Sequence, residues 1–205
     1  MSRKKPVIVF EGIEGTGKSY HLSKISKYLT KKKIPHLKIR EPGGSNNSEK
    51  IRKLILSNKS TFNKETDLFL YLAARSENMT LLKRNYKKKV ILIDRFIDST
   101  IAYQHYGQGV DLKLIESFNK YLIRNFNIDF TFLNIVNKKN LFQRLKKRKS
   151  LNRYDQFDIN FYNKVQKGFL KLAKSNKKSY KIIDSNLDIK KNEDLILNQL
   201  KKLIK

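Results

Sequence analysis

The sequence predicts a single three-layer α/β domain built around a parallel sheet. Two observations lead to this prediction: the chain contains five short apolar runs of strand length, and longer segments of helical period separate them. Parallel neighbouring strands need a crossover long enough to hold a helix, which this alternation supplies. With 205 residues and 39% hydrophobic content, the chain can bury one sizeable core. We therefore expect one domain over residues 1–205.

The predicted elements follow one another as strand and helix along the chain. In the first helix, Leu22, Ile25 and Leu29 recur at spacings of three and four residues and form one buried stripe. The runs VILID and FTFLNIV are continuously apolar, as expected of strands that are buried on both faces. Strands are expected at 6–11, 36–40, 90–94, 130–136 and 180–184, and helices at 19–33, 48–57, 65–86, 97–106, 111–126, 138–149, 157–175 and 190–204.

The composition is strongly basic, with 46 lysines and arginines against 18 acidic residues and a formal net charge of +28. Dense positive charge attracts polyanions, so a nucleic-acid-binding surface is one interpretation. A generic solvated surface is the other, because 36 of these cations are lysines spread over every segment, whereas phosphate-binding patches cluster and usually include arginine. We favour the second interpretation and do not expect nucleic acid as a partner.

Cysteine usage and hydropathy indicate the compartment. The chain has no cysteine, so it can form no disulfide framework, thiolate metal site or cysteine nucleophile. It has no run of 18 apolar residues, and its first apolar run is short and ends in glutamate and glycine, as a strand does rather than a signal peptide. We expect a cytoplasmic protein without a membrane segment.

The glycine-rich loop after the first strand, GIEGTGKS at 12–19, matches the pattern Gly-x-x-x-x-Gly-Lys-Ser/Thr. Glycines let the backbone wrap a phosphate closely, and the helix that follows presents its positive dipole end. In such a loop Lys18 would bridge the β and γ phosphates of ATP, and Ser19 would offer its hydroxyl oxygen to Mg²⁺. The expected nucleotide-binding residues are Gly12, Ile13, Glu14, Gly15, Thr16, Gly17, Lys18 and Ser19.

A phosphate-binding loop alone does not distinguish a kinase from a GTPase or a motor ATPase. A GTPase would show an Asn-Lys-x-Asp motif, and the string NKKN at 137–140 lacks that aspartate. Asp94 and Arg95 follow the third predicted strand, at the sheet edge where ligands of α/β proteins bind. There an aspartate can hold Mg²⁺ through water and an arginine can grip a phosphate. A helix cap with a surface ion pair is the alternative interpretation of this pair.

Four segments together carry a resemblance to a known family: FEGIEGTGKS, REPGG at 40–44, YLAAR at 71–75 and DRFIDSTIAYQ at 94–104. In this order and over essentially the whole chain, they resemble the motif series of thymidylate kinase. The resemblance implies the P-loop nucleoside monophosphate kinase fold, with a five-stranded parallel sheet between helices. It also implies Mg²⁺-assisted phosphorylation of dTMP to dTDP by ATP for dTTP biosynthesis, in a cytoplasmic homodimer.

The same resemblance implies roles for the residues that would bind the acceptor nucleotide. Tyr71 would stack on thymine and Arg75 would donate to its carbonyl edge, chemistry that suits a flat neutral base; taken alone, this pair would be interpreted as a core anchor and a surface cation. Tyr103 would leave no room for a ribose 2′-hydroxyl, and Glu14 would accept from the 3′-hydroxyl. The expected set is Glu14, Arg40, Tyr71, Arg75, Arg95, Thr100, Tyr103 and Gln104.

The charged stretch around RKSLNRYDQFD, taken as 144–158, is expected to form a lid, although a solvated turn between helices is equally compatible with its composition. One subclass of thymidylate kinases carries an arginine where this chain has Gly15, and the other places arginines in the lid. The resemblance to the second subclass implies that Arg153 with Arg148 closes over the γ-phosphate and that Arg144 lies near adenine. The expected catalytic residues are Lys18, Asp94, Arg95, Arg148 and Arg153.

Two other functions remain open at this point. The first is a related nucleoside monophosphate kinase with a different base preference, because the donor side of such enzymes is shared. The second is a nucleic-acid-dependent NTPase, which only the net charge suggests.

Overall fold

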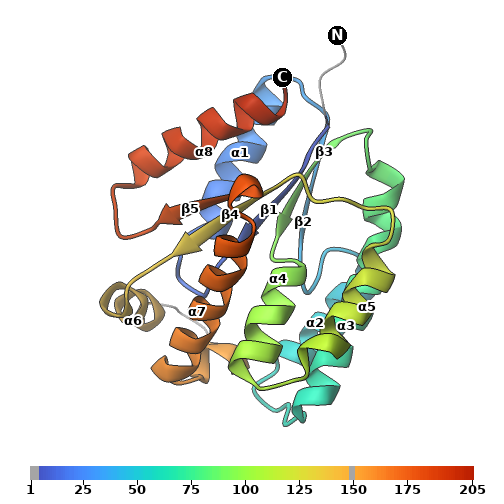
Figure 1. The fold of residues 1–205 in the computed structure, drawn as a ribbon, viewed down its shortest axis with the longest axis vertical. Coiled ribbons are helices and arrows are strands. Elements are labelled where there is room, and N and C mark those ends of the chain that lie inside the picture. The colour runs from blue at the N-terminus through green and yellow to red at the C-terminus, as the bar shows by residue number, and fades with distance from the viewer. Residues whose placement is uncertain (1–4, 148–150) are drawn as a thin grey trace.

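The computed structural model describes residues 5–147 and 151–205 and has the predicted three layers, with helices on both faces of one sheet (Figure 1). All strand pairs are parallel. The strand order is β2-β3-β1-β4-β5, so β1 and β3, which precede the two chemically distinctive motifs, are neighbours. The strands are β1 (Val7–Glu11), β2 (His36–Arg40), β3 (Val90–Asp94), β4 (Phe130–Ile135) and β5 (Tyr180–Asp184).

The apolar runs form the inner strands because both of their faces are covered. Every residue of β1 is buried, and in the sheet Val9 lies opposite Ile93 of β3 and Thr131 of β4. Helices cover the two faces of the sheet. Leu29 of α1 and Leu200 of α8 pack on one face, and Met79 and Leu82 of α3 pack on the opposite face. Burial of this kind stabilises the fold by about 1.5–3 kcal/mol for each large aliphatic side chain.

Figure 1 shows α1 and α8 side by side on one face of the sheet, with α7 and α4 on the other. The connection from α4 runs without a break into the π-helix η1. The helices are α1 (Lys18–Lys31), α2 (Asn46–Leu56), α3 (Lys64–Asn85), α4 (Ile97–Thr100), η1 (Ile101–Gly107), α5 (Leu112–Ile123), α6 (Lys138–Lys146), α7 (Ile159–Ser175) and α8 (Ile189–Leu203), with short 3₁₀ turns η2 (Arg153–Gln156) and η3 (Lys177–Ser179). None of the helices in the described ranges combines the length and the apolar character needed to cross a membrane.

Most predicted helix ends differ from the structure by one to three residues, and two segments show a local cause. The segment 97–106 was expected to be one α-helix, but it widens into η1 after four residues, and the backbone N–H of Gln108 donates to the carbonyl of Tyr103, five residues back. The helix expected at 157–175 begins two residues later, because the Asp158 side chain accepts a hydrogen bond from Phe161 N at 2.7 Å and caps it there. Apolar spacing does not distinguish these local variants.

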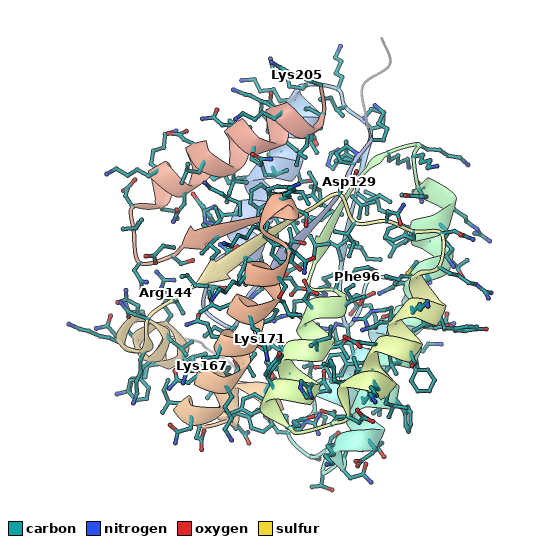
Figure 2. The ribbon with its side chains drawn as sticks, viewed as in Figure 1. Phe96, Asp129, Arg144, Lys167, Lys171 and Lys205 are labelled. Atoms are coloured by element: carbon teal, nitrogen blue, oxygen red, sulfur yellow. The ribbon has the colours of Figure 1, made fainter. Side chains whose placement is uncertain are left out.

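The positive charge is distributed rather than gathered. Figure 2 shows nitrogen-tipped side chains extending outward on every side of the view, including from the region of the labelled Lys167, Lys171 and Lys205. This distribution agrees with the interpretation of the lysines as a solvated surface.

Candidate active site

A cavity of about 360 Å³ lies at the carboxyl edge of the sheet, between the loop after β1 and the segment after β3. This is where ligands bind in open α/β sheets. The structure brings most of the sequence-predicted site residues to its walls: Glu14, Gly15, Thr16, Gly17, Lys18, Ser19, Arg40, Tyr71, Arg75, Asp94, Arg95, Thr100, Tyr103 and Gln104. Gly12, Ile13, Arg144 and Arg153 do not line the cavity, and Arg148 lies outside the described residues.

The loop from Gly12 to Gly17 folds as the glycine pattern predicts. Gly12 has a φ of +134°, and a Cβ there would stand 2.1 Å from the carbonyl oxygen of Asn134, so only glycine fits. The loop leads into α1, whose first residue is Lys18. The first N–H groups of an α-helix have no partner within the helix, and Gly17, Lys18 and Ser19 line the cavity, so this helix start favours an anion there.

Lys18 is nearly buried and its ammonium group is held inside the loop. Its Nζ donates to the carbonyl oxygens of Gly12 at 2.8 Å and Ile13 at 2.7 Å, and lies 3.3 Å from Thr16 Oγ1. Burial, followed by the charge of Arg95, lowers the pKa of Lys18 to about 7. An anion in the cavity would offset both effects and favour the charged form of the lysine.

Ser19 and Asp94 meet at the mouth of the cavity. Ser19 Oγ donates to Asp94 Oδ2 at 2.6 Å, although 75 residues separate the two in the chain. Both are oxygen ligands of the type Mg²⁺ prefers, and Mg²⁺ is usually held by one or two protein oxygens, waters and substrate phosphates. The two side chains fit such an ion. If Mg²⁺ displaced the hydrogen bond between them, the Ser19 hydroxyl and the Asp94 carboxylate would each offer an oxygen at the same place.

Arg95 lies between the phosphate-binding loop and the ring of Tyr103. Its guanidinium donates to the Gly12 carbonyl and to Glu14 Oε1, both at 2.8 Å. Burial alone would raise the pKa of Glu14, but the charges of Arg95 and Lys18 together lower it below its ordinary value. Glu14 also accepts a hydrogen bond from the Tyr103 hydroxyl. The acidic residue of the loop is therefore ionised and directed toward Tyr103.

Arg75 is 1% exposed and is fixed by four hydrogen bonds. Its Nε donates to Glu41 Oε2 at 2.8 Å, and its terminal nitrogens donate to Asn119 Oδ1 at 2.6 Å, Thr100 Oγ1 at 2.9 Å and the carbonyl of Phe96 at 3.0 Å. The carboxyl group of Glu41 has its pKa raised by burial, and Arg75 opposes this shift. Such a network holds a planar donor in one orientation.

Aromatic rings form the wall beside Arg75. Tyr71 on α3 meets Tyr154 edge to face, with ring centroids 6.0 Å apart, and Tyr154 also meets Tyr103 at 5.8 Å. Gln104 Nε2 donates to the Tyr154 hydroxyl at 3.4 Å. Thr100, Tyr103 and Gln104 all reach the cavity although η1 is a π-helix from residue 101 onward. π-Helical turns occur frequently at functional sites.

Of the arginines assigned to the lid, Arg153 and Arg144 are described, and both have protein partners in this conformation. Arg153 pairs with the buried Asp67 of α3, and its guanidinium covers the ring of Phe62 at 5.6 Å. Arg144 donates to the carbonyl oxygens of Gly15 at 2.8 Å and Ser185 at 2.7 Å. It therefore contacts the phosphate-binding loop at Gly15. Arg40, at the cavity rim, pairs with Glu49 at 3.0 Å.

Sequence reasoning missed several residues at the cavity. Tyr154 and Asn152 come from the lid segment, where only the arginines had been singled out. Arg52 of α2 also lines the cavity, and its Nη1 donates to the Pro42 carbonyl at 2.6 Å. The sequence provides only a weak indication of Arg52. It is one of ten arginines among 46 basic residues, and no motif around it marks it as a site residue.

Glu11, the last residue of β1, was also missed, although it is completely buried beside the cavity. Burial, followed by the negative charge of Asp98, raises its pKa to about 7. The unfolded chain has the ordinary lower pKa, so the folded state binds more protons between these values and Glu11 destabilises the fold as pH rises through 7.

We expect the stability of Glu11→Gln relative to wild type to increase from pH 5 to pH 8, measured by urea unfolding. A difference independent of pH would contradict this.

Comparisons with known proteins agree with this geometry. Residues 10–196 match the family model described as thymidylate kinase. That match covers most of the chain. The chain belongs to the thymidylate kinase family. Thymidylate kinases similar to it include those of Kosmotoga olearia, 31% identical over 96% of this chain and 97% of the relative, and Mycoplasma capricolum, 36% identical over 96% and 93%.

A solved structure gives the same result. The crystal structure of thymidylate kinase from Ehrlichia chaffeensis matches with a TM-score of 0.78 and 31% identity, covering 96% of this chain and 98% of that one. The predicted fold class is thereby confirmed. The rival base preferences and the nucleic-acid-dependent NTPase are not favoured, since the matches are to thymidylate kinases.

Proposed function

We propose that this chain is a dTMP kinase, a phosphotransferase that uses ATP to convert dTMP to dTDP on the way to dTTP. One observation carries the proposal: a single cavity joins the phosphate-binding loop at Lys18 to the wall formed by Tyr71, Arg75 and Tyr103. A donor phosphate and a flat acceptor base can thus be held at the same time. Family membership supports the same activity.

The transfer requires positioning and charge more than covalent chemistry. A phosphate oxygen of dTMP attacks the γ-phosphorus of ATP, and the bond from that phosphorus to the β,γ-bridging oxygen breaks, leaving ADP. Lys18 and the N–H groups at the start of α1 would hold the donor phosphates, and Arg95 would hold the acceptor phosphate. Preorganised cations of this kind stabilise the charge that spreads over the transferred group.

The acceptor nucleoside fits the opposite wall. Tyr71 would stack on thymine, and Arg75, with Thr100 and Gln104 beside it, would donate to the base carbonyl edge. The fixed ring of Tyr103 would occupy the space of a ribose 2′-hydroxyl. Glu14, ionised and already accepting from Tyr103, would accept from the 3′-hydroxyl. Arg40 would contribute at the rim, where it is half-exposed.

We propose Mg²⁺ as the metal, with Ser19 as a ligand and Asp94 holding it through water. When bound, the ion neutralises charge on the donor phosphates. The hydrogen bond between Ser19 Oγ and Asp94 Oδ2 supports this assignment, because it places two suitable oxygens together at the cavity mouth.

The lid residues are proposed to act after a movement. Arg153, paired with Asp67 here, would exchange that partner for the γ-phosphate, with Arg148 beside it and Arg144 near adenine.

We expect Arg153→Ala to lower kcat about 100-fold at saturating substrates, since one transition-state cation supplies several kcal/mol. Arg84→Ala, exposed in the last turn of α3, is the control and should leave kcat unchanged. Unchanged turnover in Arg153→Ala would remove this role.

We also propose a cytoplasmic homodimer. Three aromatic side chains of α3 and α5 are exposed on one side: Phe69 at 48%, Phe118 at 38% and Tyr121 at 62%. Phe69 and Phe118 meet edge to face at 6.0 Å. Exposed aromatic groups of this kind are typical of interfaces. Light scattering should give twice the chain mass, and Phe118→Lys should shift it toward the monomer; a monomeric wild type would contradict the dimer.

Coupled ADP release with a panel of acceptors tests the proposed function. The panel consists of dTMP, dUMP, AMP, CMP and GMP, each with ATP and Mg²⁺. We expect dTMP to give the highest kcat/KM, because Arg75 and Tyr71 match a neutral pyrimidine and Tyr103 opposes a ribose. A strong preference for AMP or GMP would overturn the substrate assignment.

A further inference from the structure

Glu11 contributes a buried carboxyl group that the proposed chemistry does not use. Its Oε1 accepts hydrogen bonds from the backbone nitrogens of Phe96 at 2.8 Å and Ser99 at 3.2 Å. Its Oε2 accepts from Ser99 Oγ at 2.5 Å. These donors belong to the start of α4, where Phe96, at the cap position, provides no side-chain cap. The end of β1 thus supplies the cap that the helix after β3 lacks.

Arg95 lies between β3 and this capped helix in an unfavourable backbone conformation. Its φ is +66°, a left-handed value that is unfavourable for a non-glycine residue. Such residues persist only where their surroundings hold them. The N–H of Arg95 donates to the carbonyl of Phe10 at 2.9 Å, and the next N–H along the chain donates to Glu11. Two consecutive residues of β1 therefore fix both sides of Arg95.

This backbone conformation decides where the guanidinium of Arg95 points. It directs the side chain back over the phosphate-binding loop, to the Gly12 carbonyl and Glu14. Ser99 links the two systems, because its Oγ donates to Glu11 and lies 3.4 Å from Arg95 Nη1. Without the Glu11 carboxylate the Phe96 N–H and the Ser99 hydroxyl lose their acceptor, while the Ser99 N–H keeps the Phe96 carbonyl at 3.1 Å. Arg95 can then relax toward a right-handed backbone that withdraws its side chain.

We propose that Glu11 is a positioning residue for phosphoryl transfer, which holds Arg95 in the conformation that presents its guanidinium to the phosphate of the acceptor nucleotide. This inference rests on the proposed function and adds a residue to it. It also explains why a strand end next to a phosphate site carries a fully buried acidic group. A cap that served stability alone would affect unfolding and leave catalysis unchanged.

Asp129 provides a matched control for the alternative that Glu11 contributes to stability alone. Its Oδ2 accepts the backbone N–H of Val7 at 2.9 Å, at the opposite end of the same strand. Figure 2 labels Asp129 and Phe96, the residue whose N–H donates to Glu11. Asp129→Asn therefore alters a carboxylate that binds a main-chain N–H of β1 at the end of the strand away from Arg95.

The first measurement compares Glu11→Gln with Asp129→Asn. Glutamine keeps the size and one acceptor oxygen but cannot accept from all three donors. At pH 8, above the pKa of about 7 for Glu11, we expect kcat/KM for dTMP to fall about tenfold or more in Glu11→Gln, while KM for ATP and the affinity for thymidine, which has no phosphate, change less than about threefold. Asp129→Asn should match wild type in all of these. Wild-type kcat/KM in Glu11→Gln would overturn the proposal.

The second measurement asks whether Glu11 acts through Arg95. In an Arg95→Lys background, adding Glu11→Gln should change kcat/KM for dTMP by less than about twofold, because the group it positions is already altered. If the fold-losses in kcat/KM of the two single variants multiply in the double variant, the proposal is overturned. If Glu11→Gln does not fold, Ser99→Ala removes one donor from the same carboxylate and should lower kcat/KM about threefold with the same non-additivity; additive or absent effects would again contradict it. A wild type inactive on dTMP would instead refute the proposed function.

Discussion

Replacing Lys18 with methionine is expected to lower kcat on the order of 10²–10³-fold. Lys18 is the cation at the centre of the phosphate-binding loop, and its Nζ is fixed by the carbonyl oxygens of Gly12 and Ile13. These contacts hold it before substrate arrives, and we propose that its charge stabilises the transferring phosphoryl group. Methionine keeps the length of the stem and removes only the charged donor.

The control for Lys18→Met is Lys24→Met, on the same helix. Lys24 is half-exposed and pairs with Glu193 at 3.7 Å, outside the cavity. Steady-state rates at saturating ATP and dTMP should be unchanged in Lys24→Met. Turnover of Lys18→Met within about threefold of wild type would show that the loop does not hold the donor phosphates as proposed.

The second large effect is expected from Arg75→Met, first on stability. This substitution leaves Glu41, which is 5% exposed, as a buried carboxylate without its cation, and breaking such a pair costs about 3–5 kcal/mol. For a chain of this size that corresponds to a fall in Tm of roughly 6–20 °C. Differential scanning calorimetry measures it directly. The affinity for dTMP should fall as well, because the proposed base contact is lost.

Two further variants separate burial from charge in this prediction. Arg40→Met breaks the neighbouring pair with Glu49, which is about half exposed, so it should cost less than about 1 kcal/mol. Adding Glu41→Gln to Arg75→Met removes the uncompensated charge and should recover part of the lost stability. The coupling between Arg75 and Glu41 would be contradicted if Glu41→Gln lowered the free energy of unfolding as much in the Arg75→Met background as it does in wild type.

The strands and the phosphate-binding loop could be predicted from local sequence. The run at 90–94 is continuously apolar because β3 is covered on both faces, and its bounds match the structure. The loop signal is equally local, since Gly12 and Lys18 belong to one eight-residue pattern that sits between a strand and a helix. Periodicity did not reveal the change to a π-helix at Ile101, because apolar spacing in so short a segment fits either helix.

The contacts that complete the site depend on residues far apart in the chain. Arg153 and Asp67 are 86 residues apart, and Glu11 accepts from Phe96 across 85 residues. Nothing in the neighbouring sequence marks Asp67 or Glu11 as partners of those groups. Only the strand order, which places β1 beside β3, brings Glu11 under the turn at Arg95.

The most direct test of the central claim is the nucleotide balance of the reaction. The enzyme is incubated with ATP, Mg²⁺ and dTMP, and the nucleotides are separated by anion-exchange chromatography. A dTMP kinase should form dTDP and ADP in equal amounts, and omission of dTMP should stop ADP formation. ADP released without dTDP, or at the same rate without dTMP, would identify a nucleotide hydrolase and contradict the function proposed here.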